Sequence, residues 1–460
     1  MHSLDVFFNP KSVAIVGATP KTGKVGRVIL ENFKRKFKGK VYAVNPKYRE
    51  VLGVPSYPTL KDIPEDIDLG VIAIPAPSVP QVVRDAADKN VKGLIIISGG
   101  FSEVGEEGRK LEEEIKKIII EYGIRVIGPN CLGVYDAFSG VDTFFLPEER
   151  MRRPVKGPIA IISQSGAFAA TILDWAAPRG IGIGKAVSYG NKIDVDDIEL
   201  MKYFEKDPTV KAILIYIEGL KKGQGLKFIE TAREIVKSKP ILILKGGKTK
   251  RGVEAAASHT AALAGTYELY KAAFKQAGII EACGFEDLFD MAKALTTQPP
   301  AQGKRVLVLT DAGGMGVMAT DALESLGLEV PELSDSIKSV LKEKLPPHCI
   351  IRNPVDLTGD ATDERYKIVL DTVLPSNEVD VALVITQMQV PTLTEKIVDY
   401  IYEATKYRKP IVVCMTGSEF TEEIAKKIES KNIPVYPSPE RAAKAVWALY
   451  KYNVYRTRVG

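Results

Sequence analysis

Residues 12–26, SVAIVGATPKTGKVG, place a continuous apolar run directly before a glycine-containing loop. The run is rich in Val and Ile, which is typical of a strand buried on both faces. Similar runs, separated by stretches with helical patterning, recur at residues 40–44, 69–74, 93–97 and 125–127. This alternation predicts an α/β unit in which helices cover a parallel sheet.

The same opening, a strand followed by a glycine-containing turn and a helix, occurs twice more. It is found in IAIISQSGAFAA at residues 159–170 and in VLVLTDAGGMGVMA at residues 306–319. Many doubly wound sheets begin in this way, and the likeness between the two stretches is consistent with duplicated flavodoxin-like domains.

Breaks in the pattern divide the chain. A Pro- and charge-rich stretch covers residues 144–157, and the polar stretch TTQPPAQGK covers residues 296–304. A chain of 460 residues is long enough for about three domains. We therefore predict a Rossmann-like domain at 1–145, followed by two flavodoxin-like, doubly wound domains at 153–298 and 302–460.

The composition excludes several classes of protein. Hydrophobic residues make up 45% of the chain and charged residues 26%, which is typical of a globular protein, and the net charge of +5 is spread along the sequence. No basic arm indicates nucleic-acid binding, and no apolar run has membrane-spanning length. The four cysteines lie far apart, so no metal site is predicted. With no leader-like start, we expect a cytoplasmic protein.

The first glycine-containing loop is a candidate phosphate site. Gly17, Ala18 and Thr19 open the loop, and Gly23, Lys24, Val25 and Gly26 lead into the helix. Backbone amides at a helix N-terminus hold phosphate oxygens. The spacing does not match a Walker A motif, because Gly17 and Gly23 are one residue too far apart and Val25 follows Lys24. The alternative is a tight turn without a ligand.

The second predicted strand ends in Asn45, Pro46 and Lys47. A dinucleotide site would have a carboxylate there to bind the ribose hydroxyls. An amide followed by a lysine suits a ligand with a phosphate near its ribose, such as CoA with its 3′-phosphate, and NADP is a competing candidate. A solvated surface lysine is the alternative without a ligand.

His259 is a candidate nucleophile. It lies in a loop rich in Gly, Ala and basic residues that follows the predicted strand at residues 241–245, and the small neighbours Ala261, Ala262 and Ala264 leave room around it. Parallel sheets bind ligands at the carboxyl ends of their strands, and an imidazole can accept a phosphoryl group. A loop histidine without a catalytic role is the alternative.

Two further features favour a phosphate site near His259. Ser163, Gln164, Ser165 and Gly166 stand between a strand and a helix, where hydroxyls and free backbone amides can hold phosphate, although simple helix capping is the alternative. Glu218 follows a buried strand and can orient an imidazole, although a surface ion pair is equally compatible with its position.

Together these segments resemble the NDP-forming acyl-CoA synthetases, the superfamily that includes succinyl-CoA synthetase. SHTAALAG at 258–265 is similar to the family's phosphohistidine segment, although Ala261 stands where the family commonly has glycine. GPNCLGV at 128–134 is similar to the end of its CoA-binding domain. SQSGAFA at 163–169 and SYGNKIDVD at 188–196 are similar to turns of its second domain.

The resemblance implies roles for the residues. His259 would carry the phosphoryl group, Glu218 would steady it, and Ser163, Gln164, Ser165 and Gly166 would hold phosphate. The first domain would be CoA-binding, and CoA would contact the glycine loop, Asn45, Pro46 and Lys47, together with Ile74, Pro75, Ser98, Gly99, Phe101 and Asn130.

The implied activity is that of an acid–thiol ligase, an ADP-forming acetate–CoA ligase. Acyl-CoA, ADP and phosphate would give the acid, ATP and CoA, reversibly, through an acyl phosphate and a phosphohistidine. Nothing in the sequence resembles an ATP-grasp domain. The resemblance therefore implies a separate ATP-grasp β subunit that binds ADP or ATP with Mg²⁺, in an α2β2 heterotetramer.

Two other functions compete with this interpretation. An NADP-dependent oxidoreductase would explain the first domain but not the SHTAALAG and SQSG segments. A regulatory CoA-binding protein without catalysis is the second alternative. Asp356 and Asp360 could suggest metal binding, but no third ligand stands at a recognisable spacing, and we interpret their segment as an interface loop.

Overall fold

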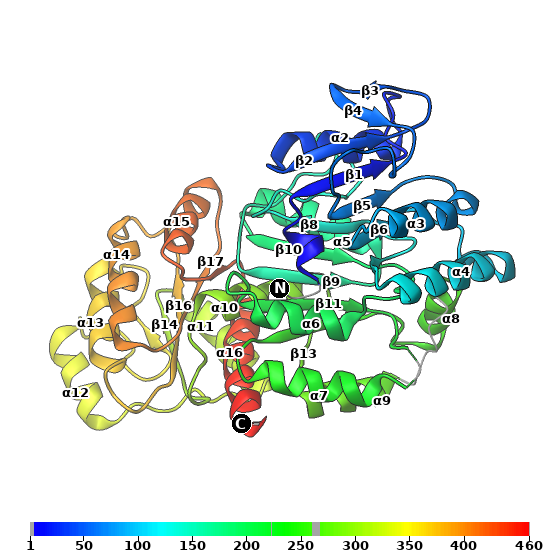
Figure 1. Cartoon of the computed structure of the whole chain (residues 1–460). Coiled ribbons are helices and arrows are strands. Elements are labelled where there is room, and N and C mark those ends of the chain that lie inside the picture. Colours follow the sequence, from blue (N-terminus) through cyan, green and yellow to red (C-terminus); the bar gives the residue numbers. More distant parts are fainter. Residues whose placement is uncertain (1–3, 222, 260–266, 460) are drawn as a thin grey trace. The chain divides into compact units, whose positions relative to one another are not determined.

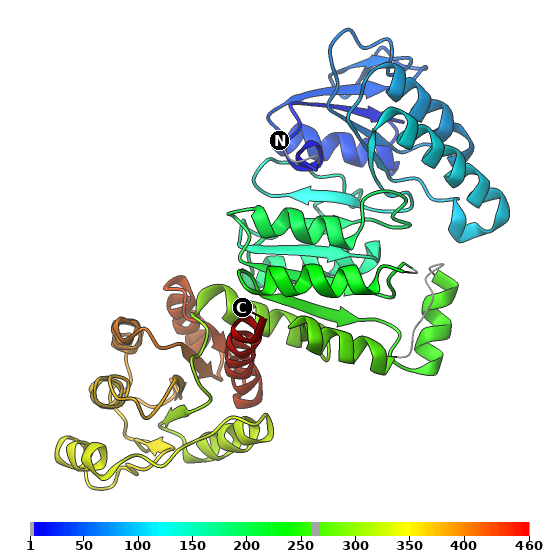
Figure 2. The ribbon, with the colours of Figure 1, turned by 60° about the horizontal axis from the view of Figure 1, so that its bottom comes forward.

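The computed structural model describes residues 4–221, 223–259 and 267–459, and their side chains except those of 255–259 and 459. Residues 1–281 and 282–460 form two compact units. The first unit contains two sheets and the second contains one (Figures 1 and 2). Within the described ranges, no helix is both long and apolar enough to cross a membrane.

The first sheet has the strand order of a Rossmann fold. Its order is β3-β4-β2-β1-β5-β6-β7. Apart from β3, which pairs antiparallel with β4, neighbouring strands are parallel, and in chain order they read 3-2-1-4-5-6. The strands are β1 (Ser12–Val16), β2 (Lys40–Val44), β3 (Glu50–Val51), β4 (Val54–Tyr57), β5 (Leu69–Ile72), β6 (Gly93–Ile96) and β7 (Arg125–Ile127). The helices of this part are α1 (Asp5–Phe8), α2 (Val25–Lys36), α3 (Val79–Asp88) and α4 (Glu106–Tyr122), with short turns η1 (Ala76–Ser78) and η2 (Ser102–Val104).

The second sheet has the order of flavodoxin. Its order is β13-β12-β11-β9-β10-β8, and the five parallel strands read 2-1-3-4-5 in chain order. The strands are β8 (Gly133–Asp136), β9 (Ile159–Ser163), β10 (Ile183–Ser188), β11 (Ala212–Ile217), β12 (Ile241–Lys245) and β13 (Ile280–Glu281). The helices are α5 (Gly166–Ala176), η3 (Ala177–Arg179), α6 (Asp197–Lys206), α7 (Gly225–Val236), α8 (Lys250–His259) and α9 (Tyr267–Ala277).

The third sheet, in the second unit, also reads 2-1-3-4-5, with the order β15-β14-β16-β17-β18. The strands are β14 (Val306–Thr310), β15 (Val355–Asp356), β16 (Val381–Thr386), β17 (Ile411–Met415) and β18 (Val435–Tyr436). The helices are α10 (Phe285–Thr297), α11 (Gly313–Ser325), α12 (Asp335–Lys344), α13 (Asp363–Val373), α14 (Lys396–Glu403), η4 (Ala404–Tyr407), α15 (Glu419–Ser430) and α16 (Pro439–Val459). The predicted α/β class with parallel sheets is confirmed.

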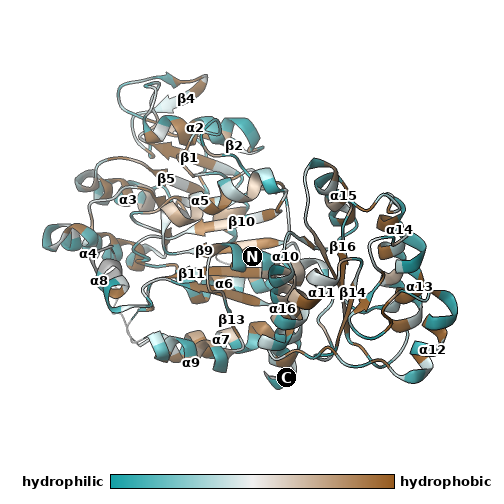
Figure 3. Cartoon of the chain, turned by 180° about the vertical axis from the view of Figure 1, so that it is seen from behind, coloured by the Kyte–Doolittle hydropathy of each residue, from teal (hydrophilic) through white to brown (hydrophobic). Residues whose placement is uncertain are grey.

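Apolar periodicity explains how helices cover the sheets. In α3, Val79, Val83, Ala86 and Ala87 recur at helical spacing and are buried in one core with strand residues such as Ile72. Figure 3 shows the strands largely brown and many helices with teal outer faces. The burial of both faces explains why the strands read as continuous apolar runs.

Two elements belong with different partners from those that their sequence position suggests. The strand β8, from the segment before residue 145, pairs antiparallel with β10 and completes the second sheet. The helix α10, from the segment before residue 298, lies in the second unit, where its Asp290 forms an ion pair with Arg441 of α16, with 2.8 Å between Nη2 and Oδ1. The exact boundaries of three domains stay a prediction.

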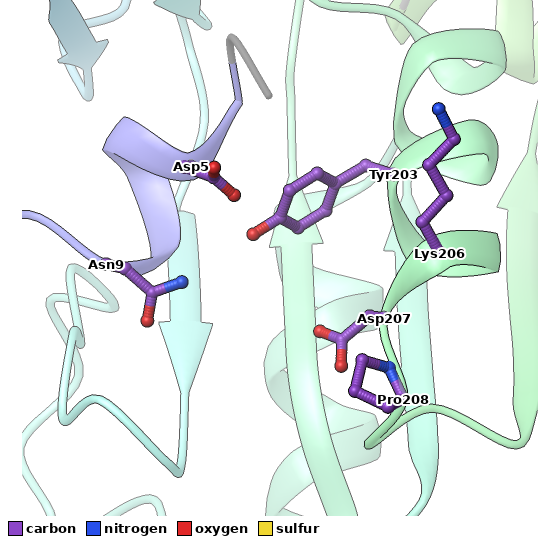
Figure 4. A pocket seen from close by; sticks show the side chains of 6 residues that line it. All are labelled: Asp5, Asn9, Tyr203, Lys206, Asp207 and Pro208. Atoms are coloured by element: carbon purple, nitrogen blue, oxygen red, sulfur yellow. The ribbon is translucent and has the colours of Figure 1, made fainter. Parts of the chain in front are cut away.

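The N-terminal helix α1 packs against the second sheet's helix α6. Phe8 stacks on Tyr203 with 4.7 Å between ring centroids. A hollow of about 250 Å³ lies beside this contact (Figure 4), lined by Asp5, Asn9, Tyr203, Lys206, Asp207 and Pro208. Burial, and then the nearby carboxylate of Asp5, raise the pKa of Tyr203. The stacking of Phe8 on Tyr203 thus connects the N-terminal helix α1 to a helix of the second sheet.

The stretch predicted as the first linker is anchored by a buried ion pair. Arg153 Nε lies 2.8 Å from Asp142 Oδ2, and both side chains are almost fully buried. The same guanidinium donates to the carbonyls of Met151, Phe144 and Leu146. The polar residues that suggested a loose linker thus fold the chain back onto the first unit.

Replacing Arg153 by Met should strongly destabilise the first unit. Burial already raises the pKa of Asp142, and the loss of its partner would leave a buried carboxylate without a counter-ion. We expect a loss of about 3–5 kcal/mol and a melting temperature at least about 6 °C lower in calorimetry. Arg152→Met, at an exposed neighbouring position, is the matched control and should change stability little. Equal stability of the two variants would show that the buried ion pair between Arg153 and Asp142 does not stabilise the first unit.

Candidate functional site

A large hollow lies at the carboxyl ends of the first sheet's strands. It has a volume of about 850 Å³. The predicted ligand residues that line it are Gly17, Thr19, Lys24, Val25, Gly26, Asn45, Pro46, Lys47, Ile74, Pro75, Ser98, Gly99 and Asn130. It lies where the strand order reverses, between β1 and β5, which is where doubly wound sheets bind ligands. Most of the residues predicted to bind CoA therefore lie around one pocket, and their role in binding CoA stays a prediction.

Some predicted residues lie outside the lining, and some lining residues were missed. Ala18 and Phe101 are fully buried behind it, and Gly23 does not line it. Lys21, Tyr48, Ala73, Ile97 and Phe145 line the pocket without having been predicted. Lys21 and Tyr48 adjoin predicted residues and could have been found by extending each loop, whereas Phe145 comes from the stretch interpreted as a linker.

In the glycine loop, the backbone at the start of α2 lies very close to the backbone that follows β1. A Cβ at Gly26 would lie 2.1 Å from the Gly17 carbonyl oxygen, so only glycine fits there. Asn45 Nδ2 donates to the Ala18 carbonyl at 2.8 Å, and Asn45 Oδ1 accepts from the Lys47 amide at 3.0 Å. Asn45 thus holds the loop and Lys47 together at the pocket. The side chains of Lys21, Lys24 and Lys47 are exposed, which gives the pocket rim a positive charge suited to an anionic ligand.

A smaller hollow of about 190 Å³ adjoins this pocket. It shares Gly17, Asn45, Pro46 and Ile74 with the larger one. Its other lining residues are mostly apolar, namely Val16, Val44, Pro58, Thr59, Leu60, Val82 and Asp85. The first domain therefore offers an open, basic pocket beside an apolar slot.

The second candidate site lies at the strand-order reversal of the second sheet, between β9 and β11. Ser165 caps α5 by accepting the Phe168 amide at 3.3 Å, and Ser163 Oγ donates to the Ser165 carbonyl at 2.7 Å. Gln164 Oε1 accepts the amides of Glu218 and Gly219 at 2.8 and 3.2 Å. The Ser163 hydroxyl thus donates within the protein, whereas Ser165 and Gln164 use only their acceptor oxygens in these bonds. An anion here could be held by the backbone amides that begin α5, together with the Ser165 hydroxyl and the Gln164 amide nitrogen.

Glu218 is held in place beside this helix terminus. Tyr216 donates its hydroxyl to Glu218 Oε1 at 3.3 Å, and its ring stacks on Phe168 with 4.1 Å between centroids. Burial, and then the Glu218 carboxylate, raise the pKa of Tyr216 to about 12, so the hydroxyl stays a donor. The buried Lys245 donates to the Glu218 carbonyl at 2.7 Å. Tyr216 is a contact that the sequence did not identify.

His259 is the last residue of α8. Its side chain, and all of residues 260–266, including Ala261, Ala262 and Ala264, lie outside the described part of the structure. The predicted approach of His259 to Glu218 therefore stays a prediction.

The two candidate sites are joined by a short piece of chain. Asn130 lines the first pocket, and Leu132, two residues later, donates its amide to Ser188 Oγ of the second sheet at 3.2 Å. A Cβ at Gly166 would lie 3.1 Å from the Leu132 side chain, so α5 begins in contact with this segment. The pocket residue Asn130 is thus two residues away from the segment that contacts the start of α5.

The aspartates of the second unit form local contacts. Asp360 accepts from both Arg365 and His348, with 3.0 Å to Arg365 Nη2 and 3.1 Å to His348 Nε2. Asp356 Oδ1 accepts the Thr358 amide at 2.8 Å. Over the described residues, no three His, Cys, Asp or Glu side chains gather as metal ligands.

Comparisons with known families match most of the chain in three parts. A CoA binding domain model matches residues 11–137, a succinyl-CoA ligase like flavodoxin domain model matches 156–295, and a ligase-CoA domain model matches 306–459. Each match contains most of one sheet, although the first match also includes β8, which pairs in the second sheet, and the second includes most of α10, which lies in the second unit.

Similar proteins match over the same length. The chain is 40% identical to the acetate–CoA ligase (ADP-forming) I subunit alpha of Pyrococcus furiosus, with 99% of each chain covered. It is also 40% identical to the acetate–CoA ligase (ADP-forming) I of Archaeoglobus fulgidus, and there it spans 64% of the relative. The solved dinucleotide forming acetyl-coenzyme A synthetase 1 of Ca. Korarchaeum cryptofilum, in complex with phosphate and ADP, is 38% identical with a TM-score of 0.92, covering 100% of this chain and 98% of that one.

The glycine loop provides a test of the first pocket. Gly26→Ala should displace the loop, because the added methyl group would overlap the Gly17 carbonyl. We expect CoA affinity, measured by calorimetry, to fall at least about tenfold while the fold persists. The matched control is Gly314→Ala, the second residue of α11 as Gly26 is of α2, where an added Cβ meets nothing within 4 Å. Unchanged CoA affinity in Gly26→Ala would contradict this placement.

Proposed function

The chain belongs to the family of ADP-forming acetate–CoA ligases, and we propose that it is the CoA-binding, phosphohistidine-carrying α subunit of such an enzyme. The observation that carries the proposal is the contact between Leu132, two residues after the pocket residue Asn130, and the helix terminus at Gly166. That contact would bring a thioester and a phosphate together. Family membership does not favour the two alternatives, an NADP-dependent oxidoreductase and a CoA-binding protein without catalysis.

In this proposal CoA occupies the first pocket. The glycine loop and the start of α2 would bind its pyrophosphate, because the first amides of a helix attract anions. Lys47, beside the end of β2, would pair with the 3′-phosphate, and the apolar slot next to Asn45 and Pro46 would receive the base. The pantetheine arm would then run past Ser98, Gly99 and Asn130 toward α5.

The reaction follows from this arrangement. Phosphate, held at the start of α5, attacks the thioester carbonyl carbon; the carbon–sulfur bond breaks, and CoA leaves as a thiolate that takes up a proton. A nitrogen of His259 then attacks the phosphorus of the acyl phosphate, and the acid is released as the phosphorus–oxygen bond breaks. Glu218, oriented by Tyr216, would accept a hydrogen bond from the other imidazole nitrogen. Covalent catalysis divides one difficult transfer into two easier ones.

The final transfer to ADP requires a nucleotide site, which we assign to a partner. The relatives from A. fulgidus and Methanocaldococcus jannaschii are single chains of which this chain spans 64%. We propose that the remaining third corresponds to a separate ATP-grasp β subunit that binds ADP with Mg²⁺, in a cytoplasmic α2β2 assembly. Acetate and similar small acids are the proposed substrates.

Phosphoryl transfer can be followed directly. The chain incubated with acetyl-CoA and radiolabelled phosphate should gain acid-labile, base-stable label, because phosphohistidine has these properties. His259→Ala should lose the label completely. His348→Ala, at an exposed histidine paired with Asp360, is the matched control and should label like the wild type. Addition of the partner and ADP should discharge the label as ATP. If CoA binds but no label forms under any acyl-CoA, the regulatory alternative takes the place of this proposal.

The placement of Lys47 predicts a ligand-specific loss of affinity. Lys47→Ala should weaken CoA binding about three- to tenfold and leave dephospho-CoA binding unchanged, because only CoA carries the 3′-phosphate. Calorimetric titration of both ligands measures this difference. Lys38→Ala, an exposed lysine outside the pocket, should bind both ligands like the wild type. Equal losses for the two ligands would show that Lys47 contacts another part of CoA.

A further inference from the structure

One wall of the proposed CoA pocket is an irregular turn, residues 98–103, whose backbone is held by hydrogen bonds to side chains. Ser98 and Gly99 line the pocket, and the turn continues through Gly100 and Phe101 to η2. The side chain of Glu103 reaches back to accept the amides of Gly100 and Phe101 through Oε1, at 2.6 and 3.1 Å. The turn is therefore shaped by a carboxylate rather than by regular secondary structure.

A second carboxylate supports the same turn. Glu112 of α4 accepts both the hydroxyl and the amide of Ser102, at 2.7 and 3.3 Å. The free oxygen of Glu103 and the bonded oxygen of Glu112 both lie within 2.9 Å of one nitrogen atom, Nδ2 of Asn191. Two like charges this close repel one another unless a donor lies between them.

Asn191 supplies that donor from the second sheet. It follows β10, in the loop 189–196, and its Nδ2 group donates to Glu103 at 2.7 Å and to Glu112 at 2.9 Å, and lies 3.2 Å from the Ser102 hydroxyl oxygen. Partial burial alone would raise the pKa of Glu103, but the bonds from Asn191 and the backbone amides lower it, so the group stays a carboxylate. An amide nitrogen with two hydrogens suits this position, whereas a carboxylate there would face two others.

The Asn191 backbone connects this contact to the phosphate site. Its amide donates to the Pro129 carbonyl at 2.9 Å, next to the pocket residue Asn130. The following residue, Lys192, is buried, pairs with Asp197 at 2.8 Å and lies 3.5 Å from the Gly219 carbonyl. The Gly219 amide in turn donates to Gln164. A continuous series of hydrogen bonds thus leads from the CoA-side turn to the residues that precede α5.

We propose that Asn191 is a positioning residue that fixes the 98–103 turn of the CoA pocket relative to the phosphate site of the second sheet. This inference rests on the proposed function, since its purpose is to present the thioester of acyl-CoA to bound phosphate. Asn191 touches neither CoA nor phosphate in this account. It acts through Glu103 and Glu112, which hold the turn.

The isosteric variant Asn191→Asp tests the proposal. It keeps the shape of the side chain but replaces the donor by a third carboxylate. With the partner present, we expect the KM for acetyl-CoA to rise at least about tenfold, while the KM for ADP and the melting temperature stay near wild-type values. The matched control is Asn90→Asp, an exposed asparagine of the same unit, which should leave all parameters unchanged.

A reversal of polarity separates positioning from a general loss of structure. In Asn191→Asp/Glu103→Gln, the new amide can keep its oxygen on Gly100 and Phe101 and donate from its nitrogen to the new carboxylate. The KM for acetyl-CoA should then fall at least threefold relative to Asn191→Asp alone. Asn191→Ser, which keeps a smaller donor, should show an intermediate KM and serves if Asn191→Asp does not fold.

Three results would overturn the inference: an unchanged KM for acetyl-CoA in Asn191→Asp, a uniform loss of every kinetic parameter together with stability, or no recovery in the double variant. Turnover of acetyl-CoA by the wild-type enzyme distinguishes failure of the Asn191 inference from failure of the proposed function. If the wild type turns over acetyl-CoA and only the variants behave differently from expectation, the role of Asn191 is wrong and the ligase assignment stands. If the wild type with its partner shows no turnover, the ligase assignment itself fails.

Discussion

The structure of the first unit depends on how residues 128–136 cross from one sheet to the other. The amides of Asn191 and Ile193, after β10, donate to the carbonyls of Pro129 and Gly128, and Leu132 donates to Ser188. The chain then enters β8, which pairs with β10 in the second sheet. These bonds are made by the backbone or a buried hydroxyl. They therefore fix the position of one sheet relative to the other without depending on surface side chains.

That crossing places two strand-order reversals side by side. Each doubly wound sheet offers one natural binding position where its strand order reverses. In the proposed reaction CoA and phosphate must meet, and a single sheet offers only one such position. Asn130 lies in the wall of the first candidate site and Leu132 contacts Gly166 of the second, so two residues of chain separate these contacts. The close packing at Gly166 shows why a small residue stands at the start of α5.

Much of the fold could be predicted from the sequence because parallel, doubly buried strands have a strong local pattern. The residue types of the loops after β1 and β2 indicated Gly17 and Asn45 as ligand-binding residues, whereas Ile74 and Ser98 were assigned to the same site by resemblance to the family. Contacts between distant segments could not be predicted in this way. Arg153 looked like part of a charged linker, and its buried pairing with Asp142 depends on how the chain folds back.

The same reason explains what was missed at the site. Phe145 enters the pocket from the stretch interpreted as a linker, and Asn191 acts on a turn some ninety residues earlier in the chain. Ser163 and Gln164 were assigned to phosphate from their residue types. In the structure the Ser163 hydroxyl donates within the protein, whereas Gln164 uses its amide oxygen, which an anion would not need; no residue pattern reveals this difference.

The second and third sheets share one hydrogen bond between the loops after two equivalent strands. Its acceptor is a side-chain amide in the second sheet and a carboxylate in the third. After β9 and β11, the amide oxygen of Gln164 accepts the backbone amide of Glu218. After the equivalent strands β14 and β16, the carboxylate of Asp311 accepts the backbone amide of Gln387. Burial raises the pKa of Asp311 to about 6, so near neutral pH this position is largely anionic.

The difference between Gln164 and Asp311 makes an anion less favourable at the third sheet than at the second. In the second sheet, the group at the helix start is a neutral amide, Ser165 caps α5, and the buried Lys245 lies beside Glu218. In the third sheet, the charge of Asp311 lies before α11, and among the described side chains none caps that helix. Both helices begin with backbone amides, but the group just before α5 is a neutral amide, whereas the group just before α11 is a carboxylate. The charge of Asp311 therefore disfavours a second anion at the start of α11.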